Sequence, residues 1–312
     1  MHRATKLLAC TVALCALASM PRSAAAAPLA ELVSVTTEDK VLLHGLYYAP
    51  LHASRIAVVH LPGGPGAFYS AQDMGPLAES LTRRGYQFLS INLRTAGANG
   101  LLYSKFDDYQ RDIAAAMRLA TSRGASEVIL LAHSLSSARA FYYVARTHDP
   151  LVKGLVVSGA ITSPYEEAQM RFDDAKRADY DRFLATQREL VKTGQGRQLA
   201  SYEWGPGRIL ELSAGTWVDL FGSPTDSNAS TVKFASEITL PVLIVHGTKD
   251  PTALPANAER ILAALTHCPK KDLVWIDGAD HLFTAHAGVY AERVSAWIAE
   301  NFPNKPLPAA RH

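Results

Sequence analysis

Short, nearly continuous apolar runs alternate with helical stretches through the middle of this 312-residue sequence. Residues 128–132, Val-Ile-Leu-Leu-Ala, form one such run, and the helical pattern of residues 136–147 follows almost at once. An unbroken apolar run is typical of a strand buried on both faces, as in a parallel sheet that helices cover on either side. Strand, helix, strand and helix in this order predict a doubly wound, mostly parallel α/β sheet.

Most other segments fit the same sheet. Residues 32–37 and 41–48 flank the turn-forming Glu38-Asp39-Lys40 and predict an opening β-hairpin. The remaining predicted strands are residues 56–61, 86–93, 152–158, 241–246 and 272–276. The other predicted helices are residues 74–84, 107–123 and 289–301.

One segment departs from this alternation of strands and helices. Residues 164–236 contain no buried apolar strand, whereas residues 166–192 are charged and helical and residues 209–221 are amphipathic. We interpret residues 164–236 as a helical cap inserted into the sheet domain. That domain then consists of residues 27–163 and 237–303, and a flexible tail follows over residues 304–312.

The cap is expected to emerge at the carboxyl edge of the sheet, because it follows one parallel strand and precedes the next. In that position it can exclude water and form the walls of a substrate pocket. Trp204, Trp217 and Phe221 are the side chains that we expect in such a wall. Packing of the cap's own small core is the alternative role for these aromatic residues.

The N-terminal segment has the pattern of a secretory signal peptide. Arg3 and Lys6 precede an apolar run over residues 7–18, and the alanines at residues 24–27 provide a small-residue cleavage site. The apolar run is too short to span a bilayer. We therefore expect residues 1–26 to be removed and the mature protein to be exported, to the periplasm or the medium.

Removal of residues 1–26 changes the charge and the cysteine content. These residues hold three of the 31 basic residues and none of the 29 acidic ones, so the net charge becomes −1 instead of +2. Such a chain has no electrostatic basis for binding nucleic acid. Of the three cysteines only Cys268 stays, which excludes an internal disulfide. No later segment is long and apolar enough to cross a membrane.

The sequence Ala132-His133-Ser134-Leu135-Ser136 lies where a buried strand passes directly into a helix. A turn this tight needs small residues two positions before and after its tip, and Ala132 and Ser136 take the place of the usual glycines. The turn raises the Ser134 hydroxyl above the sheet and places the Leu135 N–H where it can stabilise an oxyanion. We expect Ser134 to be a nucleophile; an ordinary helix cap is the alternative.

Two further polar residues follow predicted parallel strands. Asp250 comes just after residues 241–246, and His281 just after residues 272–276. Each alone has an ordinary explanation, Asp250 as a turn residue and His281 as a packed side chain. With Ser134 they follow the order serine, acid, histidine, and parallel strands bring their carboxyl ends to one edge. The order therefore predicts a triad of nucleophile Ser134, base His281 and orienting carboxylate Asp250.

From its first hairpin to its last helix, the mature chain resembles the α/β-hydrolases, with an esterase- or lipase-like triad. In that family the loop after the third strand supplies the second oxyanion N–H, and residues 61–66, Leu-Pro-Gly-Gly-Pro-Gly, stand in this place. Because Pro62 has no N–H, the resemblance implies Gly64 as the donor, with Gly63 second. The sequence departs from the family at the elbow, which lacks both glycines, and at Pro62, where many members have His-Gly.

The Gly-Gly-Pro-Gly string at residues 63–66 also resembles the proline iminopeptidases, which are capped members of the same fold. Their caps carry acidic residues that hold the amino group of a substrate. The corresponding candidates in this cap are Glu166, Glu167, Asp173 and Asp174. A charged, solvated helix surface is the alternative explanation for these carboxylates.

Together these patterns predict an exported serine hydrolase that forms an acyl-enzyme with a small-molecule or lipid-like substrate and cleaves a carboxylic ester or related acyl bond. The triad needs no metal or other cofactor, and the mature chain has no His-Glu-x-x-His or Gly-x-Gly-x-x-Gly motif. An aminopeptidase of the proline-iminopeptidase kind and a non-catalytic binding protein on a hydrolase fold are the alternative functions.

Overall fold

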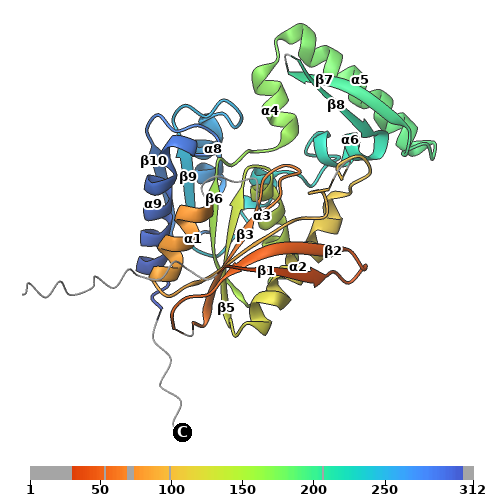
Figure 1. Ribbon diagram of the computed structural model, residues 1–312. Coiled ribbons are helices and arrows are strands. Elements are labelled where there is room, and N and C mark those ends of the chain that lie inside the picture. Colours follow the sequence, from red (N-terminus) through yellow and green to blue (C-terminus); the bar gives the residue numbers. More distant parts are fainter. Residues whose placement is uncertain (1–29, 53, 69–73, 98–99, 206, 305–312) are drawn as a thin grey trace, which may run out of the picture.

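An eight-stranded sheet forms the centre of the computed structural model, which describes residues 30–304 except 53, 69–73, 98–99 and 206 (Figure 1). The strand order is β1-β2-β4-β3-β5-β6-β9-β10, and only β1–β2 and β2–β4 pair antiparallel. The predicted signal peptide, residues 1–26, and residues 305–312 of the predicted tail lie outside the described residues. The strands are β1 (Ala30–Thr36), β2 (Leu42–Tyr48), β3 (Ile56–Leu61), β4 (Gln87–Ile91), β5 (Glu127–His133), β6 (Val152–Ser158), β9 (Val242–Gly247) and β10 (Lys271–Ile276).

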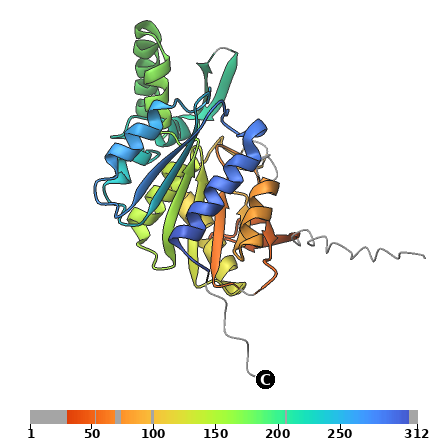
Figure 2. The same ribbon diagram turned by 90° about the vertical axis from the view of Figure 1, so that its left-hand side faces the viewer.

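Helices cover both faces of this sheet, as Figures 1 and 2 show. Every side chain of β3 is buried, and its successive residues enter different cores. Val58 belongs to the core that contains residues of α1 and α9, whereas Val59 belongs to the core that contains residues of α2, α3 and α8. The predicted doubly wound, mostly parallel sheet is therefore confirmed. The helices are α1 (Met74–Arg83), α2 (Tyr109–Ser122), α3 (Ser136–Thr147), α8 (Ala256–Ala264) and α9 (Ala287–Asn301).

Most of the segment 164–236 projects from the carboxyl edge of the sheet as a lobe of its own (Figure 1), whereas its last helix packs against α3 and α8 of the sheet domain. It is not wholly helical, which corrects the expectation of a helical cap. Two of its segments, β7 (Leu199–Gly205) and β8 (Arg208–Ser213), pair as an antiparallel hairpin. These strands have exposed and charged positions, so they lack the continuous apolar run of the central strands. Its helices are α4 (Pro164–Arg171), α5 (Asp174–Lys192), α6 (Ala214–Phe221) and α7 (Thr231–Ala235).

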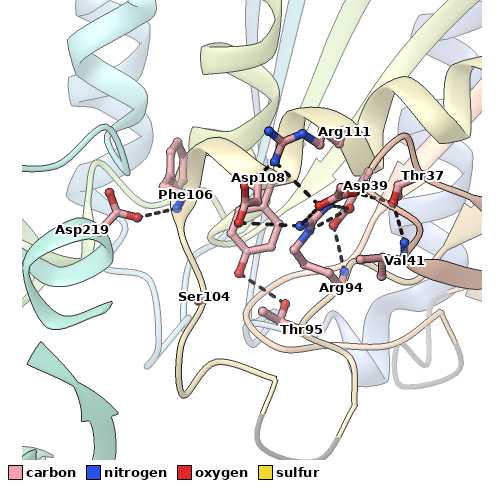
Figure 3. A network of polar contacts seen from close by, with 12 residues as sticks. Thr37, Asp39, Val41, Arg94, Thr95, Ser104, Phe106, Asp108, Arg111 and Asp219 are labelled. Atoms are coloured by element: carbon pink, nitrogen blue, oxygen red, sulfur yellow. Dashed lines mark hydrogen bonds and ion pairs between the residues drawn. The ribbon is translucent and has the colours of Figure 1, made fainter. Parts of the chain in front are cut away.

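Helix α6 attaches the lobe to the segment that precedes α2. The Thr216 hydroxyl donates to the Leu102 carbonyl at 3.1 Å and to the Ser104 carbonyl at 3.2 Å. The Asp219 carboxylate accepts a hydrogen bond from the Phe106 N–H (Figure 3). These contacts hold the lobe against the carboxyl edge of the sheet.

Arg94, in the loop after β4, joins three parts of the sheet domain (Figure 3). Its guanidinium donates to Asp39 in the β1–β2 turn at 2.8 Å and to Asp112 of α2 at 2.9 Å. The Arg94 N–H also donates to Asp112 at 2.8 Å. Burial raises the pKa of Asp112 although Arg94 opposes this shift, whereas the bond from Arg94 lowers the pKa of Asp39. The opening hairpin is thereby anchored to the sheet's helical layer.

Candidate active site

Ser134 lies at the tip of the turn between β5 and α3, with a φ angle of +54°. This left-handed conformation is rare for a residue other than glycine and costs about 1–3 kcal/mol. The Ser134 N–H donates to the Ser158 carbonyl at 2.9 Å, which holds the turn against β6. Ala132 and Ser136, two positions to either side, are fully buried. The predicted strained strand-to-helix turn is therefore present, and a larger side chain at either position would have no room.

The loop after β3 packs directly on this turn. A Cβ atom added to Gly63 would lie 2.6 Å from the Ser134 Cβ, so only glycine allows the loop to approach this closely. Gly64 adopts a φ of +52°. Among the described residues, neither the Gly64 N–H nor the Leu135 N–H has a hydrogen-bond acceptor. Both predicted oxyanion donors therefore remain available to a ligand beside Ser134.

Two residues of α3 fasten this loop, and the sequence patterns did not identify the second of them. The Ser136 hydroxyl donates to the Pro62 carbonyl at 2.5 Å. The Arg139 guanidinium donates to the Gly64 carbonyl at 3.1 Å and to the Ser136 hydroxyl at 3.0 Å. Arg139 is 1% exposed and its guanidinium stacks over the Tyr109 ring at 3.8 Å. In the sequence, Arg139 is marked only as a charged residue within the predicted helix over residues 136–147.

Asp250 and His281 are in direct contact. The His281 Nδ1 lies 2.8 Å from the Asp250 Oδ2. The other carboxylate oxygen accepts hydrogen bonds from the N–H groups of Thr252 at 2.7 Å and Ala253 at 2.8 Å. The carboxylate is buried and fixed on both oxygens, so it can orient the imidazole and stabilise its charged form.

The two other carboxylates near His281 in the sequence point elsewhere. Asp277 accepts a hydrogen bond from the Thr248 hydroxyl at 3.0 Å. Asp280 accepts one from the Thr284 N–H at 2.9 Å. Asp250 is therefore the carboxylate that the structure brings to His281.

Ser134 and His281 face one small cavity of about 190 Å³. The structure contains no direct hydrogen bond between these two side chains. Contacts of this kind often close only when substrate is bound. Gly159, with a φ of +50°, leaves the space that His281 occupies, because a Cβ there would lie 3.1 Å from its Nδ1. The cavity is lined by His60, Pro62, Gly63, Gly64, His133, Ser134, Arg208, Thr252, His281 and Leu282.

Three buried histidines surround this cavity or lie behind it. Burial lowers the pKa of His60 to about 3, and burial also lowers the pKa values of His133 and His246. The His133 ring lies 4.7 Å from the His281 ring, centroid to centroid. An uncharged His133 does not repel positive charge on a neighbouring group.

A larger cavity of about 460 Å³ opens from Ser134 toward the lobe. This volume is in the range of small-molecule sites. Phe221 and Trp204 line it, as expected. Trp217 does not: its side chain is 0% exposed and its Nε1 donates to the Ala200 carbonyl at 2.9 Å. The expectation for Trp217 was therefore wrong, because the core of the lobe takes up this residue. The apolar lining consists of Pro65, Leu101, Leu135, Ile161, Pro164, Phe172, Trp204, Leu210, Phe221 and Pro251.

Metal and membrane features can be assessed for the same residues. Within the described ranges, no three His, Cys, Asp or Glu side chains are grouped in a way that suits a metal ion. No helix in the described part of the chain combines the length and apolar character that a membrane span requires.

Comparisons with known proteins agree with this fold. The chain aligns with the esterase domain of a Rhodothermus marinus protein at 19% identity, covering 87% of this chain and 98% of that one, with a TM-score of 0.59. It aligns with Est1E from Butyrivibrio proteoclasticus at 16% identity, covering 86% and 98%, with a TM-score of 0.63. At these identities the likeness shows the fold.

Sequence relatives cover less of the chain. Alpha/beta hydrolase domain-containing protein 17C from Xenopus tropicalis is 34% identical over 70 residues, which are 22% of this chain and 22% of that protein. The model of the family described as serine aminopeptidase, S33 (Hydrolase_4), matches residues 54–286. Because this match extends over well more than half of the sequence, the chain belongs to the S33 serine aminopeptidase family of α/β-hydrolases.

Proposed function

We propose that this protein is an exported serine hydrolase that cleaves a carboxylic ester through an acyl-enzyme. The observation that carries the proposal is the 2.8 Å contact between Asp250 and His281 beside a serine whose φ is +54°. A strained serine at a strand-to-helix turn costs folding free energy, and such strain is concentrated at functional sites. The wall of one cavity includes Ser134 and His281, so a reacting group can reach both.

In the first step, His281 takes the proton of the Ser134 hydroxyl as the oxygen attacks the substrate carbonyl. The Gly64 and Leu135 N–H groups hold the oxyanion that develops, and the N-terminus of α3 adds its dipole. Asp250 keeps the Nδ1 proton of His281 in place, which leaves Nε2 free as the base. His281 then gives its proton to the leaving alcohol, and an acyl group remains on Ser134.

In the second step, water replaces the alcohol and the same groups act in reverse. His281 removes a proton from the water, which attacks the acyl carbonyl while the same two N–H groups hold the oxyanion. The tetrahedral intermediate releases the acid, and Ser134 regains its proton from His281. All four proton transfers pass through one imidazole.

The bond type is inferred from the pocket and from the names of similar structures. The aligned Rhodothermus marinus structure is named as an esterase domain, which supports an ester substrate. The family description favours an aminopeptidase as the second candidate. Recognition of a substrate amine needs an available carboxylate, so the four acidic residues of the lobe bear on this choice.

Each of these four carboxylates already has a partner. Glu166 pairs with Arg260 at 2.7 Å, and Asp174 pairs with Arg177 at 2.9 Å. Glu167 is bound by Asn257 and by Arg171, and Asp173 accepts from the Lys176 N–H at 2.8 Å as the cap of α5. These contacts favour the ester over the amine-bearing peptide.

A graded panel of substrates tests the bond type. Turnover of p-nitrophenyl esters of increasing acyl length is compared with that of L-prolyl p-nitroanilide and L-alanyl p-nitroanilide. We expect hydrolysis of the esters with a value of kcat/KM that depends on acyl length. Preferential hydrolysis of the two anilides would contradict the proposed esterase activity and favour an aminopeptidase.

Export is the second part of the proposal, and it rests on the basic, apolar and small segments of residues 1–26. The measurement is N-terminal sequencing of the protein recovered outside the cytoplasm. We expect a mature N-terminus close to residue 27. A full-length chain confined to the cytoplasm would contradict this part alone.

A further inference from the structure

The two cavities at the candidate active site have one basic residue in common, Arg208. It is the first residue of β8, and it lines both the small cavity at His281 and the larger cavity beneath the lobe. Ser134 also lines both cavities. A substrate that fills the larger cavity and reaches Ser134 therefore lies in a space that Arg208 also lines.

The larger cavity contains two other basic residues, and both are engaged. Arg171 donates to the Glu167 carboxylate at 3.1 Å and to the Pro251 carbonyl at 2.8 Å. The Lys176 ammonium lies over the Phe172 ring at 5.0 Å from its centroid, and 3.9 Å from a Glu203 oxygen. These two cations have their charge balanced within the protein.

Arg208 differs from them. Its guanidinium makes no hydrogen bond, ion pair or ring contact with any residue that the structure describes. Glu203, on the paired strand, does not serve it, because Glu203 accepts from the Gly207 N–H at 3.0 Å and lies beside Lys176. Asp173 lines the same cavity but caps α5. Arg208 is exposed to solvent where it lines this mostly apolar pocket, and its donors are available to a ligand there.

We propose that Arg208 makes this enzyme selective for esters that carry a carboxylate group, which the guanidinium binds while the scissile carbonyl lies at Ser134. The inference deepens the proposed function and rests on it. The planar guanidinium offers paired donors that match the two oxygens of a carboxylate. The apolar wall formed by Leu210, Trp204 and Phe221 suits the hydrocarbon or aromatic part of such a substrate. The same cation disfavours a protonated amine.

Two matched pairs of substrates test the proposal. The mono-p-nitrophenyl esters of adipic acid and adipamic acid differ by a charge on the acyl side. In the pair p-acetoxybenzoate and p-acetoxybenzamide the difference is on the alcohol side. The measured quantity is the ratio of kcat/KM for the charged member to that for the neutral member of each pair.

The variants are Arg208→Gln and Arg208→Lys, with Arg182→Gln as the matched control. Arg182 lies on α5 with its side chain 70% exposed, away from both cavities. We expect Arg208→Gln to lower the ratio about tenfold in at least one pair, since Arg208 is solvent-exposed and a charged hydrogen bond is then at the weak end of its range. Arg208→Lys should restore part of the ratio, and Arg182→Gln should leave it unchanged.

The outcomes separate this proposal from the function on which it rests. If the wild-type enzyme hydrolyses the neutral esters and Arg208→Gln changes neither ratio, the proposed carboxylate preference is wrong, but the proposed esterase activity remains supported. Calorimetric binding of p-acetoxybenzoate to Ser134→Ala, with and without Arg208→Gln, gives a readout without turnover. Equal binding by the two variants would also overturn the role of Arg208. Absence of turnover with the whole panel would overturn the proposed function.

Discussion

The Ser136 hydroxyl donates a hydrogen bond to the Pro62 carbonyl, with 2.5 Å between the two oxygens. Ser136 stands two positions after the proposed nucleophile, where hydrolases of this fold commonly have glycine. The serine is small enough for the tight turn, and its hydroxyl fastens the loop that presents Gly64. Arg139 adds a second tie from the same helix to the Gly64 carbonyl. Helix α3 thus holds both the turn of the proposed nucleophile and the loop that contains Gly64.

Ser136→Ala should lower kcat about tenfold and change KM little, because a loosened loop positions its N–H less well for the transition state. Ser122→Ala, at an exposed serine of α2 that bonds the Leu119 carbonyl, is the control and should retain kcat. Kinetics and melting temperature are measured for both variants. An unchanged kcat for Ser136→Ala would show that the hydrogen bond has no part in positioning the loop.

Asp250→Asn should lower kcat by about 10³- to 10⁴-fold, because the imidazole loses its orienting charge. Asp277→Asn and Asp280→Asn should stay within about threefold of the wild type, because both carboxylates are exposed and neither bonds His281, and surface substitutions usually change the folding stability by less than about 0.5 kcal/mol. Turnover of all three variants with one ester decides the assignment. Similar losses in the three would remove Asp250 from its role.

Trp217→Ala should lower the free energy of unfolding by about 3–5 kcal/mol without changing the preferred acyl length, since its ring is buried in the lobe. Phe221→Ala should shift that preference, because Phe221 lines the cavity. Denaturant unfolding and the graded ester panel are measured side by side. A shift in preference for Trp217→Ala and none for Phe221→Ala would reverse these two roles.

The buried His60 should make stability depend on pH. Its folded pKa is about 3, below the ordinary value of 6.5, so between these values the unfolded chain binds a proton that the folded protein excludes. The contribution of the uncharged His60 to the free energy of unfolding is fully present above pH 6.5. It is lost as pH falls below that value, by up to about 1.4 kcal/mol per pH unit.

His60→Leu should therefore remove about 2 kcal/mol of the difference in unfolding free energy between about pH 7 and about pH 5. Burial also raises the pKa values of Asp112, Glu167 and Asp219, and these shifts increase the free energy of unfolding as pH falls, opposite to the effect of His60. The pH dependence of the wild type alone therefore does not isolate His60, and the variant must be compared with it. His44→Leu, at an exposed site on β2, is the control. The same pH slope for wild type and His60→Leu would contradict this assignment.

The sheet was predictable because its central strands are buried on both faces and read as unbroken apolar runs. The structure also brings Asp250 to His281, a contact expected from the position of each just beyond a parallel strand. Their order along the chain and the shared edge of the sheet carried that inference. It did not depend on any one motif.

The hairpin of β7 and β8 was not predictable in the same way. Leu199 is 41% exposed and Ile209 is 70% exposed, so neither strand has an unbroken apolar run. The stretch 209–221, which begins within β8, has the pattern of an amphipathic helix, and the sequence therefore favoured a helix there. The roles of Arg139 and Arg208 depend on which distant segments meet them. A sequence shows an arginine, but not whether a carboxylate lies within its reach.

The central claim is that Ser134 is the nucleophile, and labelling with a fluorophosphonate followed by peptide mass mapping tests it most directly. The account predicts one modification, at Ser134, with loss of ester turnover in proportion to labelling. Ser134→Ala should take up no label and lose at least about 10³-fold in kcat while it remains folded. Labelling at Ser136 or Ser137, or turnover of Ser134→Ala at the wild-type level, would contradict the account. A protein that binds esters yet takes up no label would be a binding protein on a hydrolase fold.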